Sequence, residues 1–182
     1  MARITPTTAQ LAELANTHLY YEVAMLRGAL AEQDKRRAET PHIRDLDRDD
    51  PIRIACMAFF EAALIHARVL DDFLTLPPPN SGRNADDIWA GDYVPNWQPP
   101  NPSPLDRANP VVPGQKVRDS INKQLAHFSV LRLQQTAFYV GRITAEVLHD
   151  LKLFAEDTNN VCYQELQGVR DLINRAPWRT ET

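Results

Sequence analysis

The sequence predicts an all-α protein, an antiparallel bundle of four main helices followed by a short C-terminal helix. Apolar residues recur every three or four positions in five stretches, which is typical of helices with one buried face. No stretch shows the apolar–polar alternation of a strand. Ten of the fourteen prolines fall in residues 76–114, so irregular structure is expected there. We therefore predict that residues 1–182 form a single helical-bundle domain.

The first predicted helix covers residues 8–37. Its apolar side chains form two neighbouring stripes, which indicates a broad buried face. Basic residues 35–37 suit the negative end of the helix dipole. A polar, acidic connector follows at residues 38–50. The stripes are Leu11, Leu14, His18, Tyr21 and Met25, and Leu19, Val23, Leu26 and Leu30.

The second predicted helix runs from Pro51 to about Thr75. Asp50 is a good N-cap, and a proline at the first helical position favours a helix start. Its N-terminal half is apolar nearly all round, so we expect this helix to be the central and most buried element. The most apolar run, residues 54–60, is far shorter than the roughly 20 residues of a membrane span, so no membrane association is expected.

Residues 76–114 form a long proline-rich insertion between the second and third helices. Trp89, Tyr93 and Trp97 lie within it, and such side chains are costly to leave exposed to water. We therefore expect residues 85–98 to pack on the bundle. An irregular segment of this length is usually functional or disordered, and the aromatic residues favour a functional one.

Three further helices complete the prediction. The third opens after Pro113-Gly114 and breaks near residues 127–129. The fourth extends from there to about Phe154, and the short last helix covers residues 161–175. Their periodic apolar positions are Val117, Ile121, Leu125 and Phe128 in the third, Leu133, Ala137, Val140, Ile143, Val147, Leu151 and Phe154 in the fourth, and Tyr163, Leu166, Val169 and Ile173 in the last.

Composition excludes some classes of function. A net charge of −4 and a pI near 5.7 argue against DNA binding and against coating of nucleic acid, although a local basic patch could still serve an enzyme acting on RNA. The N-terminal residues lack the pattern of a secretory signal. Cys56 and Cys162 are far apart and are expected to be reduced core thiols, which predicts a cytoplasmic protein. No Cys/His spacing indicates zinc, so no metal or cofactor is expected.

A polar cluster interrupts the second helix. Arg68 and Asp72 form an i,i+4 pair, with Glu61 on the same side and His66 on the neighbouring face. Three interpretations stay open. In the first, Glu61 and Asp72 neutralise Arg68 while His66 bonds a loop carbonyl or carboxylate. In the second, His66 and Arg68 line a pocket for an anionic group. In the third, His66 binds a metal together with loop carboxylates, although no second-ligand spacing exists for it.

Asp86, Asp87 and Asp92 lie among the aromatic residues of the insertion. One interpretation is a solvated acidic loop. In the other, the aromatic anchors hold these carboxylates so that they pair with Arg68, Lys123 or the histidines and cover a site between the helices. Such a cover would repel phosphate, which argues against an RNA substrate.

A second polar cluster, Asn122-Lys123-Gln124-Leu125-Ala126-His127, ends the third helix. A helical bundle with this ending resembles the HEPN superfamily (higher eukaryotes and prokaryotes nucleotide-binding domains), many of whose members are prokaryotic toxin, abortive-infection or RNA-processing proteins. The run His66-Ala67-Arg68-Val69-Leu70 also resembles the His-x-Arg-x-Leu pattern of some uncharacterised bacterial HEPN-like families. The resemblance covers the second to fourth helices, about half of the chain.

The resemblance implies RNA cleavage in active members, whose motif is arginine, a polar residue, three further residues and histidine. Aligned on His127, Asn122 stands where arginine is expected and Lys123 stands at the polar position. Asn122 cannot supply the missing charge, whereas Lys123 could act as a point charge. Arg118 lies nine residues before His127, roughly on the opposite helix face, and is a poor substitute. His127 also fits a helix-terminal histidine that bonds backbone carbonyls.

Three functional hypotheses follow. The first is a non-catalytic HEPN-like module that acts through a homodimer or an antitoxin-like protein partner, in a bacterial stress, toxin–antitoxin or phage-defence setting. The second is a metal-independent ribonuclease with an altered motif, in which His127 is the acid or base and Lys123 assists it; His66 and Arg68 are further candidates for this site. The third is a small-ligand or nucleotide-binding bundle with a pocket at His66 and Arg68.

Overall fold

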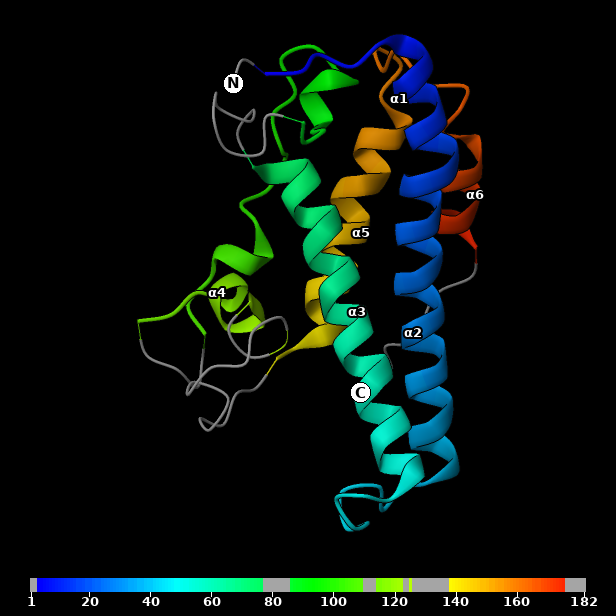
Figure 1. The fold of residues 1–182 in the computed structure, drawn as a ribbon, viewed down its shortest axis with the longest axis vertical. Helices are drawn as coiled ribbons and strands as arrows, with labels where there is room; N and C mark the ends of the chain where they lie inside the picture. Colours follow the sequence, from blue (N-terminus) through cyan, green and yellow to red (C-terminus); the bar gives the residue numbers. More distant parts are fainter. Residues whose placement is uncertain (1–2, 77–85, 110–113, 123–124, 126–137, 176–182) are drawn as a thin grey trace.

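The computed structural model describes residues 3–76, 86–109, 114–122, 125 and 138–175 (Figure 1). Within these ranges the regular elements are helices, and the β-type contact is one isolated bridge between Ala108 and Lys116. The predicted all-α bundle is therefore confirmed.

The first predicted helix is one rod made of α1 (Thr8–Leu14), a π-helical segment η1 (Ala15–Leu19) and α2 (Tyr20–Glu39) (Figure 1). It starts at a capping box, in which Thr7 and Gln10 satisfy each other's backbone N–H groups. The π-helical segment was not predicted. Buried residues recur every four positions through it, at Leu11, Ala15, Leu19 and Val23.

Helix α3 (Pro51–Thr75) has the bounds that the sequence predicts. Asp50 Oδ1 accepts hydrogen bonds from the backbone N–H groups of Ile52, at 2.8 Å, and Arg53, at 3.4 Å. The helix packs antiparallel to α2 and against α5 (Val140–Glu156) (Figure 1). Only one side is covered in this way, and the opposite side is exposed. The expectation that α3 is the most buried element is therefore wrong on its outer side.

The aromatic part of the insertion packs on the bundle, as predicted. It contains the short helix η2 (Ala90–Asp92), and Tyr93 and Trp97 beside it are buried. Tyr93 donates a hydrogen bond to the Leu11 carbonyl at 3.0 Å, and the Trp97 indole N–H donates to the Leu74 carbonyl at 2.9 Å. Both rings also meet Phe154 of α5 edge-on. These bonds tie the insertion to the first rod and to the end of α3.

The later helices follow the predicted order. Helix α4 (Val117–Ile121) comes after a second short helix of the insertion, η3 (Pro104–Asp106), while the predicted break at 127–129 lies outside the described residues. Helix α6 (Gln167–Asn174) begins six positions later than predicted. Residues 161–166 form turns instead, in which Val161 donates to the Tyr93 carbonyl at 2.9 Å.

Two further features concern the whole set of described residues. None of the helices there combines the length and the apolar character that crossing a lipid bilayer requires. Cys56 and Cys162 are both free thiols and both buried, and burial raises the pKa of Cys162.

Candidate functional site

His66 is held between α3 and α2 by a carboxylate. Its Nδ1 lies 2.6 Å from Glu22 Oε2, and its ring meets the ring of Tyr21 edge-on with the centroids 6.0 Å apart. This contact agrees with the interpretation of His66 as part of a satisfied network, although the carboxylate comes from a helix and not from a loop.

Arg68 and Asp72 form the predicted pair. Arg68 Nε donates to Asp72 Oδ2 at 3.3 Å, and Asp72 Oδ1 contacts Nη1 of Arg118, which comes from α4. Glu61, predicted to share in neutralising Arg68, has no ion-pair partner among the described residues. The cation that completes this network is therefore Arg118.

Asp71 lies at the centre of the same network and is buried. Its Oδ2 accepts from Ser103 Oγ at 2.7 Å and from Arg118 Nη2 at 2.5 Å, so the carboxylate joins α3 to η3 and to α4. Burial raises the pKa of Asp71, and the hydrogen bonds from Ser103 and Arg118 oppose that rise only in part. The third nitrogen group of Arg118, Nε, donates to Asp106 at 3.3 Å. With every nitrogen engaged by a carboxylate, Arg118 serves this network and not a phosphate.

Sequence reasoning missed Glu22, Asp71 and Arg118. For Asp71 a signal existed, because it lies three or four positions from Ala67 and Leu74, which both face the core. A carboxylate in the core stripe of a helix requires a cation and further donors. The identity of that cation was not readable, since Arg118 lies 47 positions along the chain.

Of the three residues on which the catalytic hypothesis depends, the structure describes only Asn122. Asn122 follows the last residue of α4 as its C-cap. Lys123 and His127 lie outside the described residues. Their roles, and the sharing of a site by His66 and His127, stay predictions.

The three aspartates of the insertion do not lie together over Arg68 and His66. Asp92 pairs with Arg3 and accepts a hydrogen bond from the Trp89 backbone N–H at 3.2 Å. Asp86 and Asp87 are exposed. None of the ion pairs among the described residues joins these carboxylates to Arg68 or His66. The positions of Asp86 and Asp87 agree with the solvated-loop interpretation, whereas Asp92, with only 6% of its side chain exposed, is held by Arg3 and by the backbone of Trp89.

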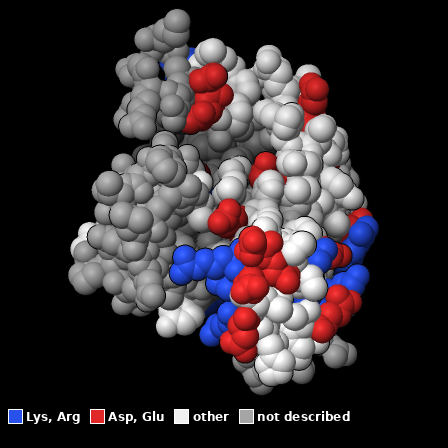
Figure 2. Space-filling model, turned by 60° about the horizontal axis from the view of Figure 1, so that its bottom comes forward, with Lys and Arg blue, Asp and Glu red and all other residues white. Residues whose placement is uncertain are grey.

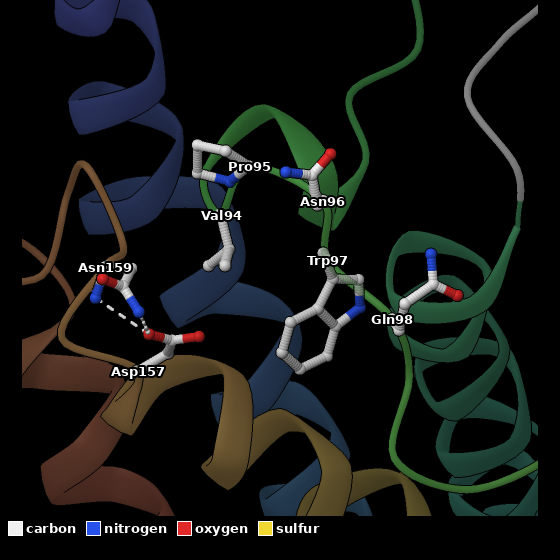
Figure 3. A pocket seen from close by; sticks show the side chains of 7 residues that line it. All are labelled: Val94, Pro95, Asn96, Trp97, Gln98, Asp157 and Asn159. Atoms are coloured by element: carbon white, nitrogen blue, oxygen red, sulfur yellow. Dashed lines mark hydrogen bonds between the residues drawn. The ribbon is translucent and has the colours of Figure 1, made fainter.

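A pocket of about 530 Å³ lies between the insertion and the turn after α5 (Figure 3). Asp157 Oδ1 in its wall accepts from the backbone and side chain of Asn159, at 2.8 and 3.0 Å. The indole N–H of Trp97 is engaged by Leu74. Several polar groups here therefore stabilise the fold itself. The lining residues are Val94, Pro95, Asn96, Trp97, Gln98, Asp157 and Asn159, so this is not the pocket predicted at His66 and Arg68.

The outer face of α3 carries several large apolar side chains that remain exposed. Large aliphatic side chains normally lose most of their exposure on folding, yet four on this face keep 42–53% of it. Exposed Tyr21 of α2 lies beside His66. We define this outer face as Ile54, Ala58, Glu61, Ile65, Val69, Asp72 and Leu76.

Charged side chains are distributed over the side of the molecule that Figure 2 draws. On the side drawn in Figure 2, which brings the connection between α2 and α3 forward, basic and acidic side chains are intermixed. Within the described ranges, no group of three His, Cys, Asp or Glu side chains lies close enough together to hold a metal ion. The described residues on this side therefore offer no continuous basic track for a nucleic-acid backbone.

Comparison with known proteins adds no further assignment. No family model, no curated protein and no solved structure matches the chain, so the predicted resemblance to the HEPN superfamily stays a prediction and the geometry alone supports the proposals below.

Proposed function

We propose that this chain is a non-catalytic helical-bundle module that assembles into a homodimer through the outer face of α3. The observation that carries the proposal is the exposure of Ile54, Ile65, Val69 and Leu76 along one side of a 25-residue helix. Contiguous apolar patches on folded proteins commonly mark interaction sites, because burying them removes apolar surface from water at about 25 cal/mol per Å².

The positions of the exposed apolar residues favour an interface over a random scatter of apolar side chains on the surface. The apolar residues of the outer face are separated by steps of four and seven residues, which keeps them on one side of the helix, with Glu61 and Asp72 at the positions between. On α2, exposed Tyr21 meets the ring of His66 on the neighbouring face of α3, and Met25, one turn further along α2, is also exposed. Aromatic residues and methionine are enriched in the cores of protein–protein interfaces.

The two alternative functions have less support. The ribonuclease hypothesis needs Lys123 and His127, which lie outside the described residues. The ligand hypothesis needs a pocket at His66 and Arg68, whereas the pocket that the structure describes is lined by other residues, from the insertion and from the turn after α5. An interaction module needs neither.

The test is the oligomeric state of the full chain, measured by light scattering after size exclusion over a wide dilution series. We expect a dimer for the wild type. Ile65→Asp places a charge in the middle of the apolar stripe and should weaken dimerisation by about tenfold or more, equivalent to about 1.4 kcal/mol.

The matched control is Leu153→Asp. Leu153 is also an exposed aliphatic residue, but it belongs to α5, away from the outer face of α3. This variant should dimerise like the wild type. A wild type that stays monomeric throughout the series, or equal weakening by both substitutions, would contradict the proposal.

A further inference from the structure

We infer that the two copies join along an antiparallel α3–α3 seam, with the two-fold axis at Ile65 and with Glu61 of each copy paired to Arg68 of the other. This inference rests on the proposed function and adds the arrangement of the partner, which the dimer alone does not specify.

The first argument is the symmetry of the outer face of α3. Its seven positions are separated by steps of four, three, four, four, three and four residues, a series that is the same in both directions about Ile65. In an antiparallel pair centred there, Ile54 meets the partner's Leu76 and Ala58 meets the partner's Asp72. A two-fold interface requires a surface that complements its own copy, and this spacing meets the requirement.

The second argument is charge. Glu61 and Arg68 lie seven residues apart, two turns of the helix, and therefore on the same flank of the stripe. A two-fold axis perpendicular to both helices places this flank of one α3 beside the same flank of the other α3, running in the opposite direction. Glu61 of one chain therefore comes next to Arg68 of the other. Glu61 lacks an ion-pair partner within the part of the chain that the structure describes. The antiparallel seam supplies one, twice per dimer.

The remaining carboxylate in the seam is already neutralised within its own chain. Asp72 contacts both Arg68 and Arg118. It can therefore lie opposite the small Ala58 of the partner without bringing in an uncompensated charge. A parallel seam would place like residues together along the whole face, including Glu61 beside Glu61 and Asp72 beside Asp72, which favours the antiparallel arrangement.

A charge exchange tests the pairing. In Glu61→Arg, each homodimer would bring two arginines together at each pair, and in Arg68→Glu two glutamates. Each variant alone should dimerise about tenfold or more weakly than the wild type. An equimolar mixture of the two variants restores opposite charges at both pairs, so the mixed dimer should form preferentially. Affinity tags of different size on the two chains measure the ratio of mixed to like dimers.

A cysteine pair tests the direction of the seam. Helices packed about 8–10 Å apart bring residues on the axis within disulfide range, so Ile65→Cys should form a covalent dimer with oxidised glutathione. Ala58→Cys, on the same face, would be separated from its copy by about 21 Å along the seam and should stay uncross-linked. The native Cys56 and Cys162 are buried and should not compete. Non-reducing electrophoresis gives the result.

The outcomes separate this arrangement from the proposed function. Cross-linking of Ala58→Cys as readily as Ile65→Cys, or a mixture of charge variants without preference for the mixed dimer, overturns the antiparallel seam while a wild-type dimer keeps the proposed function. A monomeric wild type overturns both. Circular dichroism and the thermal midpoint of each variant establish that it is folded, so that loss of dimer reports on the seam.

Discussion

At the scale of single residues, several carboxylates hold the helices together by bonding to side chains from distant parts of the chain. Asp71 accepts from Arg118, and Glu22 bonds His66. A core carboxylate without such partners would cost several kcal/mol, so the partners are a condition of the fold. The polar cluster that looks like a site in the sequence is in this way largely accounted for by structural bonds.

Asp71 provides a prediction about pH. Because burial raises its pKa in the folded chain above the ordinary value of 3.8, the folded state holds the proton more tightly than the unfolded state. The stability that this group contributes is therefore present at low pH and is lost as the pH rises from about that value through the raised pKa. In Asp71→Asn, which cannot ionise, this loss should be absent.

The measurement is the free energy of unfolding from denaturant titrations at a series of pH values. The difference between Asp71→Asn and the wild type should shift in favour of the variant as the pH rises across that window. Asp49→Asn, at an exposed position, corrects for the loss of one negative charge. A difference that stays constant across the series would contradict the assignment of a raised pKa to Asp71.

The same residues show why only part of the candidate site was predictable. The pair of Arg68 and Asp72 could be predicted because residues four apart on a helix are neighbours. Glu22 lies 44 positions from His66, and nothing local connects the two. Which distant side chain completes a polar network depends on how the helices are arranged, and periodicity does not specify that arrangement.

At the scale of elements, helix boundaries set by local chemistry were predicted best. The start of α3 follows from Asp50 and Pro51 alone, because an N-cap acts on backbone groups two or three residues away. The start of α6 was wrong because residues 161–166 form turns, the first of which is bonded through the Val161 N–H to the carbonyl of the distant Tyr93. Burial of α3 was wrong on its outer side because an apolar residue does not specify what covers it.

The cap of α3 gives a second prediction. Asp50→Ala removes the acceptor for the N–H groups of Ile52 and Arg53, so the free energy of unfolding should fall by about 1 kcal/mol. Asp49→Ala, next to it but outside the cap, should change it much less. Chemical denaturation of both variants at neutral pH measures the two values, and equal losses would show that the bonds at Asp50 contribute nothing particular.

At the scale of the whole molecule, the bundle was predictable because five periodic stretches and one proline-rich segment leave few other architectures. The arrangement in Figure 1, in which α3 packs mainly against α2 and α5, was not. A helix that is apolar on both sides is compatible with a buried position or with an interface, and the sequence alone does not distinguish them.

An interface of this kind makes stability depend on concentration. If association occurs only between folded chains, the thermal midpoint of the wild type should rise with protein concentration, whereas that of Ile65→Asp should stay nearly constant. Scanning calorimetry on a concentration series measures both. A wild-type midpoint independent of concentration would argue that the chains do not associate in the folded state.

The π-helical segment Ala15–Leu19 fixes the relative rotation of two parts of one rod. On one side of it lies the Leu11 carbonyl that receives Tyr93, and on the other lies the Glu22 carboxylate that holds His66. Deleting a single residue from the segment would turn one part against the other by about 100°, since that is the angle between consecutive residues of a helix. One anchor or the other would then point away from its partner, so the length of this short stretch is constrained even though its exposed side chains are not.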